Sequence, residues 1–134
     1  MACPACGGSV VAFRVPASLR EHAPADETAI CSVCLRTMPA SEIEAGADAA
    51  DPDEVDFSGI DDSFPSGRAG VAFALLLGKL DSLALERQSI EELCEAAERA
   101  GTDVRLALER LALAEGLEPQ FDIERRTSQL ASFR

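Results

Sequence analysis

Two cysteine pairs near the start of the chain have the spacing most typical of a chemical site. Cys3 and Cys6 form the first pair and Cys31 and Cys34 the second, with two residues inside each pair and 24 residues between the pairs. Two such pairs supply the four thiolates of a tetrahedral metal site. The sequence therefore predicts one structural Zn²⁺ bound by these four cysteines, in a zinc ribbon that ends near residue 38.

Iron is the alternative metal, because rubredoxin-type iron sites also use two cysteine pairs. Gly7 and Gly8 follow the first pair and permit the turn of a metal-binding knuckle, whereas Leu35 follows the second pair. The chain has no Tyr or Trp, which are usual around rubredoxin iron. These features favour zinc, and four cysteine ligands leave no open coordination position, so a structural site is expected. An iron electron carrier or redox sensor stays an alternative.

Two other residues could take part in chemistry, and each has a simpler interpretation. Cys94 has no Lys, Arg or His beside it to stabilise a thiolate, so we expect a small buried apolar residue. His22, the one histidine, could be a replacement ligand or a general base, but no paired nucleophile is evident and we expect a solvated loop residue. The chain also lacks a Ser-His-Asp set, a phosphate-binding glycine loop and an HExxH motif, so no enzyme is expected.

The charge balance disfavours binding to nucleic acid or to anionic membranes. The chain has 24 acidic and 12 basic residues, a net charge of −12, and Lys79 is its one lysine. Broad contact with phosphates depends on clustered Lys and Arg. Arg14, Arg20 and Arg36 are the best candidates for nucleic-acid contact, although we expect them to be solvated, and a helix-turn-helix interpretation of Ile90 to Leu111 lacks a net basic helix face. A nucleic-acid-binding regulator stays a second alternative.

The N-terminus and the hydropathy pattern indicate where the protein works. No apolar stretch approaches the roughly 20 residues that a membrane-spanning helix needs. The first residues have neither the basic nor the apolar region of a secretory signal. We therefore expect a soluble cytoplasmic protein, in which thiols stay reduced and bind metals rather than form disulfides.

Charge and periodicity divide the chain into three segments. Residues 1–38 form the zinc ribbon, with strands predicted at Ser9 to Val15 and Thr28 to Ile30 and a long hairpin loop that carries His22. Residues 39–64 form an acidic linker, since nine acidic residues and no basic residue lie between positions 39 and 66, Glu44 among them. Residues 65–134 form a helical domain. The fold class is therefore α+β, a short antiparallel sheet followed by a bundle of three or four helices.

The boundaries of these helices follow from capping signals and apolar spacing. The first helix carries Val71 to Leu85 and is apolar on most of its circumference, so it is expected to be central. Ser89 and Glu92 have the spacing of a capping box and predict the start of a second helix that ends at Gly101. Asp103 is predicted to cap a third helix that reaches Glu115 and stops at Gly116. Asp122 is predicted to cap a fourth, with Ile123, Leu130 and Phe133 as its apolar face.

Three stretches of the sequence resemble an uncharacterised family of small haloarchaeal zinc-ribbon proteins. They are Cys3-Pro4-Ala5-Cys6-Gly7-Gly8, Cys31-Ser32-Val33-Cys34 and Pro65-Ser66-Gly67-Arg68, the last of which enters an Ala- and Leu-rich helix after the acidic middle. The resemblance covers the whole chain and implies a salt-rich cytoplasm and a zinc ribbon, but no activity. High Asp and Glu with almost no Lys suit the same habitat.

The function that the sequence favours is a non-enzymatic zinc-binding protein. Ribbons whose metal has no open position serve mostly as rigid platforms. We therefore expect a protein-interaction or adaptor module linked to transcription or translation, with another protein as its partner.

Overall fold

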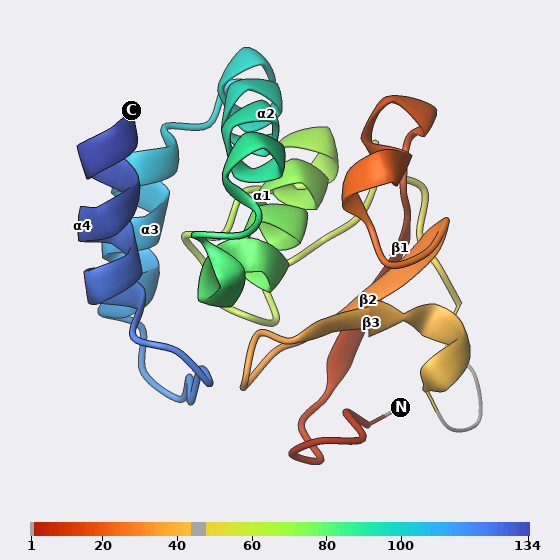
Figure 1. Ribbon diagram of the computed structural model, residues 1–134. Coiled ribbons are helices and arrows are strands. Elements are labelled where there is room, and N and C mark those ends of the chain that lie inside the picture. Colours follow the sequence, from red (N-terminus) through yellow and green to blue (C-terminus); the bar gives the residue numbers. More distant parts are fainter. Residues whose placement is uncertain (1, 44–47) are drawn as a thin grey trace.

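The computed structural model describes residues 2–43 and 48–134 and confirms the α+β class. A three-stranded antiparallel sheet is followed by four helices (Figure 1). The strands are β1 (Val10–Arg14), β2 (Glu27–Cys31) and β3 (Thr37–Pro39), and the α-helices are α1 (Gly67–Lys79), α2 (Arg87–Arg99), α3 (Val104–Ala112) and α4 (Ile123–Phe133). Short 3₁₀ helices are η1 (Ala17–His22), η2 (Ala40–Glu42) and η3 (Leu80–Ser82). Glu44 and the side chain of Phe133 lie outside the described part.

The sheet is built from the two predicted strands and a third that the sequence did not indicate. β1 and β2 pair in antiparallel register from Val10 opposite Cys31 to Arg14 opposite Glu27, and β3 adds to the free edge of β2. Alternating side chains face opposite sides of the sheet. Phe13 and Ile30 therefore enter the large core shared with the helices, whereas Val10 and Cys31 belong to a smaller apolar cluster. β3 is only three residues long, too short for a period-two pattern to be visible.

The first helix is central, as predicted. Every residue of α1 from Ala69 to Leu77 is buried, and α1 packs against α2 on one side and approaches β3 on the other (Figure 1). α3 and α4 form a second pair at the far end from the sheet. The prediction that Leu85 belongs to this buried helix is wrong: α1 ends at Lys79, η3 and a turn follow, and Leu85 is 90% exposed.

Most helix ends agree with the capping signals. The carboxylate of Asp103 accepts a hydrogen bond from the Leu106 amide at 3.0 Å, and that of Asp122 accepts from the Arg125 amide at 3.1 Å. Gly101 has φ +101°, a left-handed conformation that glycine adopts at little cost. α3 stops three residues before the predicted Glu115, because hydrogen bonds of the i to i−3 kind tighten its last turn.

The predicted capping box at the start of α2 is wrong. The helix begins at Arg87, so Ser89 is its third residue, and no side chain caps the first turn. The Ser89 hydroxyl lies instead 2.5 Å from Nδ1 of His22, across the interface with η1. A long-range partner has therefore replaced the local one.

The apolar side chains of the expected linker lie in the main core. Val55, Phe57, Ile60 and Phe64 are all buried in the cluster that also holds Phe13 of β1 and the central helix. The backbone of Ala50 pairs with β1: its amide donates to the carbonyl of Ala12, and its carbonyl accepts from the Arg14 amide. Residues 48–64 are therefore packed between sheet and helices rather than extended through solvent. The division into separately folding domains at 38 and 65 stays a prediction.

Three aspartates of this acidic segment form local turns. Asp51, Asp56 and Asp61 each accept a hydrogen bond from the amide two residues later, at 2.8 to 3.0 Å. Such turns let a chain of low hydrophobicity fold back repeatedly and bury the apolar residues between the acids. Composition alone indicated a linker because it registers the acids and not these turns.

Within residues 2–43 and 48–134, none of the helices has the length and apolar character that a membrane-spanning helix needs.

Candidate metal centre

The fold brings the four predicted ligands to one end of the β1–β2 hairpin. Cys3 and Cys6 precede β1, and Cys31 ends β2 with Cys34 in the following turn. The sulfurs of Cys3 and Cys34 are 3.8 Å apart, those of Cys6 and Cys31 are 3.4 Å apart, and all four lie within 4.8 Å of one another. Cys6 is exposed and the other three are buried, so the site is at the edge of the protein.

These distances fit a tetrahedral metal ion. Zn–S bonds of about 2.3 Å place tetrahedral sulfurs about 3.8 Å apart. A disulfide would need about 2.05 Å, and all four cysteines are free thiols. A single ion at the centre would be bound by four thiolates, which leaves no coordination position open for another ligand.

The two cysteine pairs form the same knuckle of backbone. In the first, the Cys3 amide donates to the carbonyl of Gly8 at 2.7 Å and the Gly7 amide donates to the carbonyl of Cys3 at 2.8 Å. In the second, the same two hydrogen bonds occur at identical offsets, from Cys31 to Arg36 at 2.9 Å and from Leu35 to Cys31 at 3.2 Å. The ligands are thus presented by two equivalent turns.

The second knuckle forms although Leu35, and not a glycine, follows its cysteine pair. Leu35 has φ +64° and occupies the position at which Gly7 has φ +81°. A leucine in this left-handed conformation is strained, of the order of 1–3 kcal/mol. Its side chain is fully buried in the main core, which stabilises the conformation. Leu35 therefore links the metal end of the sheet to the helices.

Backbone amides surround the sulfurs and favour their charged form. The amides of Ala5, Gly8, Val33 and Cys34 each approach a cysteine Sγ at 3.4 Å. Burial opposes ionisation of Cys3, but hydrogen bonds from the Ala5 and Cys6 amides and the neighbouring sulfurs lower its pKa to about 7. Burial raises the pKa of Cys34 to about 12 and also raises the pKa of Cys31. A cation shared by all four would remove this difference, since metal ligation requires thiolates.

Cys94 is buried in the core, as predicted. Burial raises the pKa of its thiol to about 11, so it stays protonated and unreactive at neutral pH. Its role in packing needs no further chemistry.

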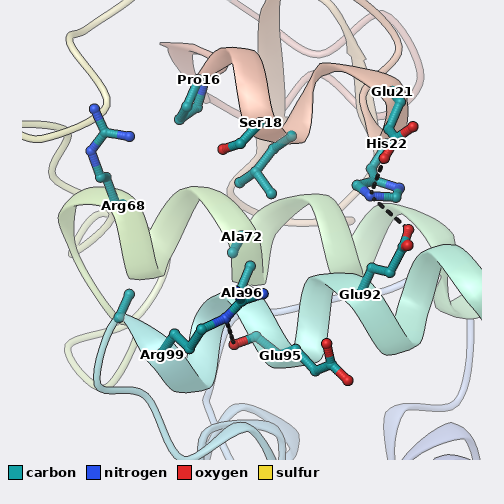
Figure 2. A pocket seen from close by; sticks show the side chains of 12 residues that line it. Pro16, Ser18, Glu21, His22, Arg68, Ala72, Glu92, Glu95, Ala96 and Arg99 are labelled. Carbon is teal, nitrogen blue, oxygen red and sulfur yellow. Dashed lines mark hydrogen bonds and ion pairs between the residues drawn. The ribbon is translucent and has the colours of Figure 1, made fainter.

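The prediction of a solvated His22 is wrong. The residue is only 7% exposed, and its ring lies between η1 and α2 with Glu21 and Glu92 at its Nε2 atom (Figure 2). The polar partners on α2 are 67 or more residues away in sequence. Ser89 and Glu92 share a helix face at i, i+3 spacing, but that pattern also suits a capping box, so nothing local pointed to the histidine.

The three arginines considered for nucleic acid make interactions within the chain. Arg14 pairs with Asp51 at 3.4 Å, and Arg20 donates to the carbonyl of Val15 at 3.2 Å. Arg36 donates to the side chain of Gln120. The three do not form an exposed basic cluster of unengaged side chains.

Comparison with protein-family models identifies the chain over nearly its full length. The protein belongs to a family of unknown function, DUF6276, whose model matches residues 2–134. No curated protein and no solved structure matches the chain significantly.

Proposed function

We propose that this member of the DUF6276 family is a non-enzymatic zinc protein that serves as an interaction or adaptor module. One structural Zn²⁺ would be held by Cys3, Cys6, Cys31 and Cys34. The observation that carries the proposal is the convergence of four sulfurs from two equivalent knuckles at tetrahedral spacing. Such a closed site supplies rigidity rather than catalysis.

Zinc is proposed over iron on the composition around the site. The equivalent knuckles suit either metal, so they do not separate the two. The absence of Tyr and Trp from the chain favours zinc. Thiolate-bound iron absorbs visible light and zinc does not, so a colourless purified protein with one zinc per cysteine site is the expected result. A coloured, iron-containing protein would support the electron carrier instead.

A helix face supports a protein as the partner. Leu106 and Leu113 lie seven residues apart on or next to α3, on the same side of the helix, and are 40% and 80% exposed. Exposed apolar residues at this spacing suit contact with another protein surface. The net charge of −12 and the engaged arginines disfavour nucleic acid. We propose that the partner is a cytoplasmic protein of the transcription or translation machinery.

Affinity purification from the native host at native salt tests this proposal. Protein and RNA bound to the wild-type chain are identified and compared with those bound to a Leu106→Ser/Leu113→Ser variant. A protein partner lost in this variant, and retained by the control Leu85→Ser, is expected. Recovery of RNA alone, equally with both variants, contradicts the adaptor proposal and favours the nucleic-acid-binding regulator.

We further propose that the acidic composition is an adaptation to a salt-rich cytoplasm. Carboxylates repel one another in dilute buffer, and the Debye length shortens from about 10 Å at 0.1 M to about 3 Å at 1 M ionic strength. The thermal midpoint of unfolding is therefore expected to rise between dilute buffer and molar potassium chloride. Equal midpoints, measured by circular dichroism, would show that the acids serve another purpose.

A further inference from the structure

A second group of potential metal ligands lies away from the cysteines, between η1 and α2. Glu21 and His22 end η1, at the loop end of the β1–β2 hairpin, whereas the cysteines lie at the opposite end. Ser89 and Glu92 face them from α2. Figure 2 shows Glu92 beside His22. The group opens on a cleft of about 510 Å³.

The three ligand atoms converge at metal-binding distances. Nε2 of His22 lies 3.1 Å from Oε2 of Glu92 and 3.4 Å from Oε1 of Glu21. Bonds of about 2.0–2.1 Å from a tetrahedral ion to nitrogen and oxygen place such ligands about 3.3 to 3.4 Å apart. One ion could therefore bind all three residues with little movement of their side chains.

A hydrogen bond at the second ring nitrogen orients the buried imidazole. Its Nδ1 lies 2.5 Å from the Ser89 hydroxyl. When Nδ1–H donates to that oxygen, Nε2 carries its lone pair toward the two carboxylates. Metal-binding histidines have this arrangement, with the second ring nitrogen donating to an outer partner. Three negative or electron-rich atoms then face one point, and a cation is needed there.

Other charges in the cleft do not supply that cation. Arg99 donates to the carbonyl of Glu95, and Arg68 is paired with Asp53. Two arrangements satisfy the convergence point: a proton on Nε2 of His22 that is donated to the carboxylates, or a bound ion.

We propose that Glu21, His22 and Glu92 form a second binding site, for a divalent transition metal such as Zn²⁺. Imidazole with carboxylates is a donor set that suits such ions. Three protein ligands leave a coordination position open toward the cleft, in contrast to the closed cysteine site. A metal here would also join the hairpin loop to α2, and it would be bound more weakly than by four thiolates.

The number of zinc ions bound per chain tests the proposal directly. The full chain is dialysed against free Zn²⁺, and bound zinc is counted by mass spectrometry. Two ions per wild-type chain are expected. Glu92→Gln should lower the affinity for the second ion by more than tenfold. Ser89→Ala should lower that affinity by about 10- to 100-fold. Glu95→Gln, on the same helix and cleft, is the matched control and should bind two. One ion in the wild type, or equal loss in Glu92→Gln and Glu95→Gln, overturns the proposal.

The single histidine gives a second readout that does not depend on the variants. The nitrogen resonances of His22 need no assignment against other histidines. Zn²⁺ added after the first equivalent should shift the Nε2 resonance at constant pH. If that resonance responds to pH but not to Zn²⁺, a proton holds the cluster together and the metal site does not exist.

Discussion

Removing the metal from the cysteine site should destabilise the whole chain, helices included. The division of the sequence into a ribbon at residues 1–38 and a helical domain at residues 65–134 predicts that only the ribbon unfolds without metal. However, Phe13, Ile30 and Leu35 are fully buried in the core shared with the helices. Structural zinc contributes about 10–16 kcal/mol of binding free energy at pH 7, which is comparable to the whole stability of a small domain at about 5–15 kcal/mol. Loss of the sheet then exposes the apolar side of α1.

Circular dichroism of the helices with and without a chelator measures this effect. The thermal midpoint is expected to fall by about 40 °C or more, because a loss of about 10 kcal/mol corresponds to about 4 °C per kcal/mol. Cys31→Ser should have the same effect at neutral pH, whereas Cys94→Ala, which removes a cysteine outside the site, should keep the metal and the response to chelator. Mild acid should also release the metal, since ligation needs thiolates. If the thermal midpoint of the helical signal is the same with and without chelator, residues 65–134 fold as a separate domain.

Replacing Phe57 by alanine should remove about 3–5 kcal/mol of stability, although the residue lies in the segment expected to be a linker. Its ring is fully buried and packs edge-on against Phe13, with 5.5 Å between the ring centroids. It also packs at a tilt against Phe64, with 4.9 Å between the centroids. Phe64 in turn contacts Phe73 of α1 at 5.1 Å. A side chain placed on Gly70 would lie only 2.5 Å from the Phe57 ring, so the ring rests directly on the α1 backbone. The alanine variant leaves a cavity where sheet and helix meet.

Chemical denaturation of zinc-loaded protein checks this value. Leu85→Ala is the control, because it also truncates a large apolar residue but at a position that is 90% exposed, and its effect should stay within about 0.5 kcal/mol. A Phe57→Ala variant as stable as this control would mean that residues 48–64 are a linker after all. Metal content should be unchanged in both variants.

Local signals in the sequence determined most of the elements and the composition of the cysteine site. The spacing inside each cysteine pair suits one turn of backbone, so both knuckles and the two strands between them followed from short stretches. Asp103 and Asp122 cap helices through amides three residues away. Interactions of this range depend on residues that are neighbours in the chain, and a single sequence records them directly.

Only the tertiary structure decided where the chain comes together over long distances. His22 finds Ser89 67 residues later, Phe57 packs on a helix and a strand from either side of it, and Leu35 holds a left-handed conformation that its burial stabilises. The same residue types would suit a solvated loop, an acidic linker or an ordinary turn, because propensity describes a residue's own backbone and not its partners. Burial and long-range polar pairing depend on the path of the whole chain. They placed the histidine cluster beside a cleft and joined three sequence segments in one core.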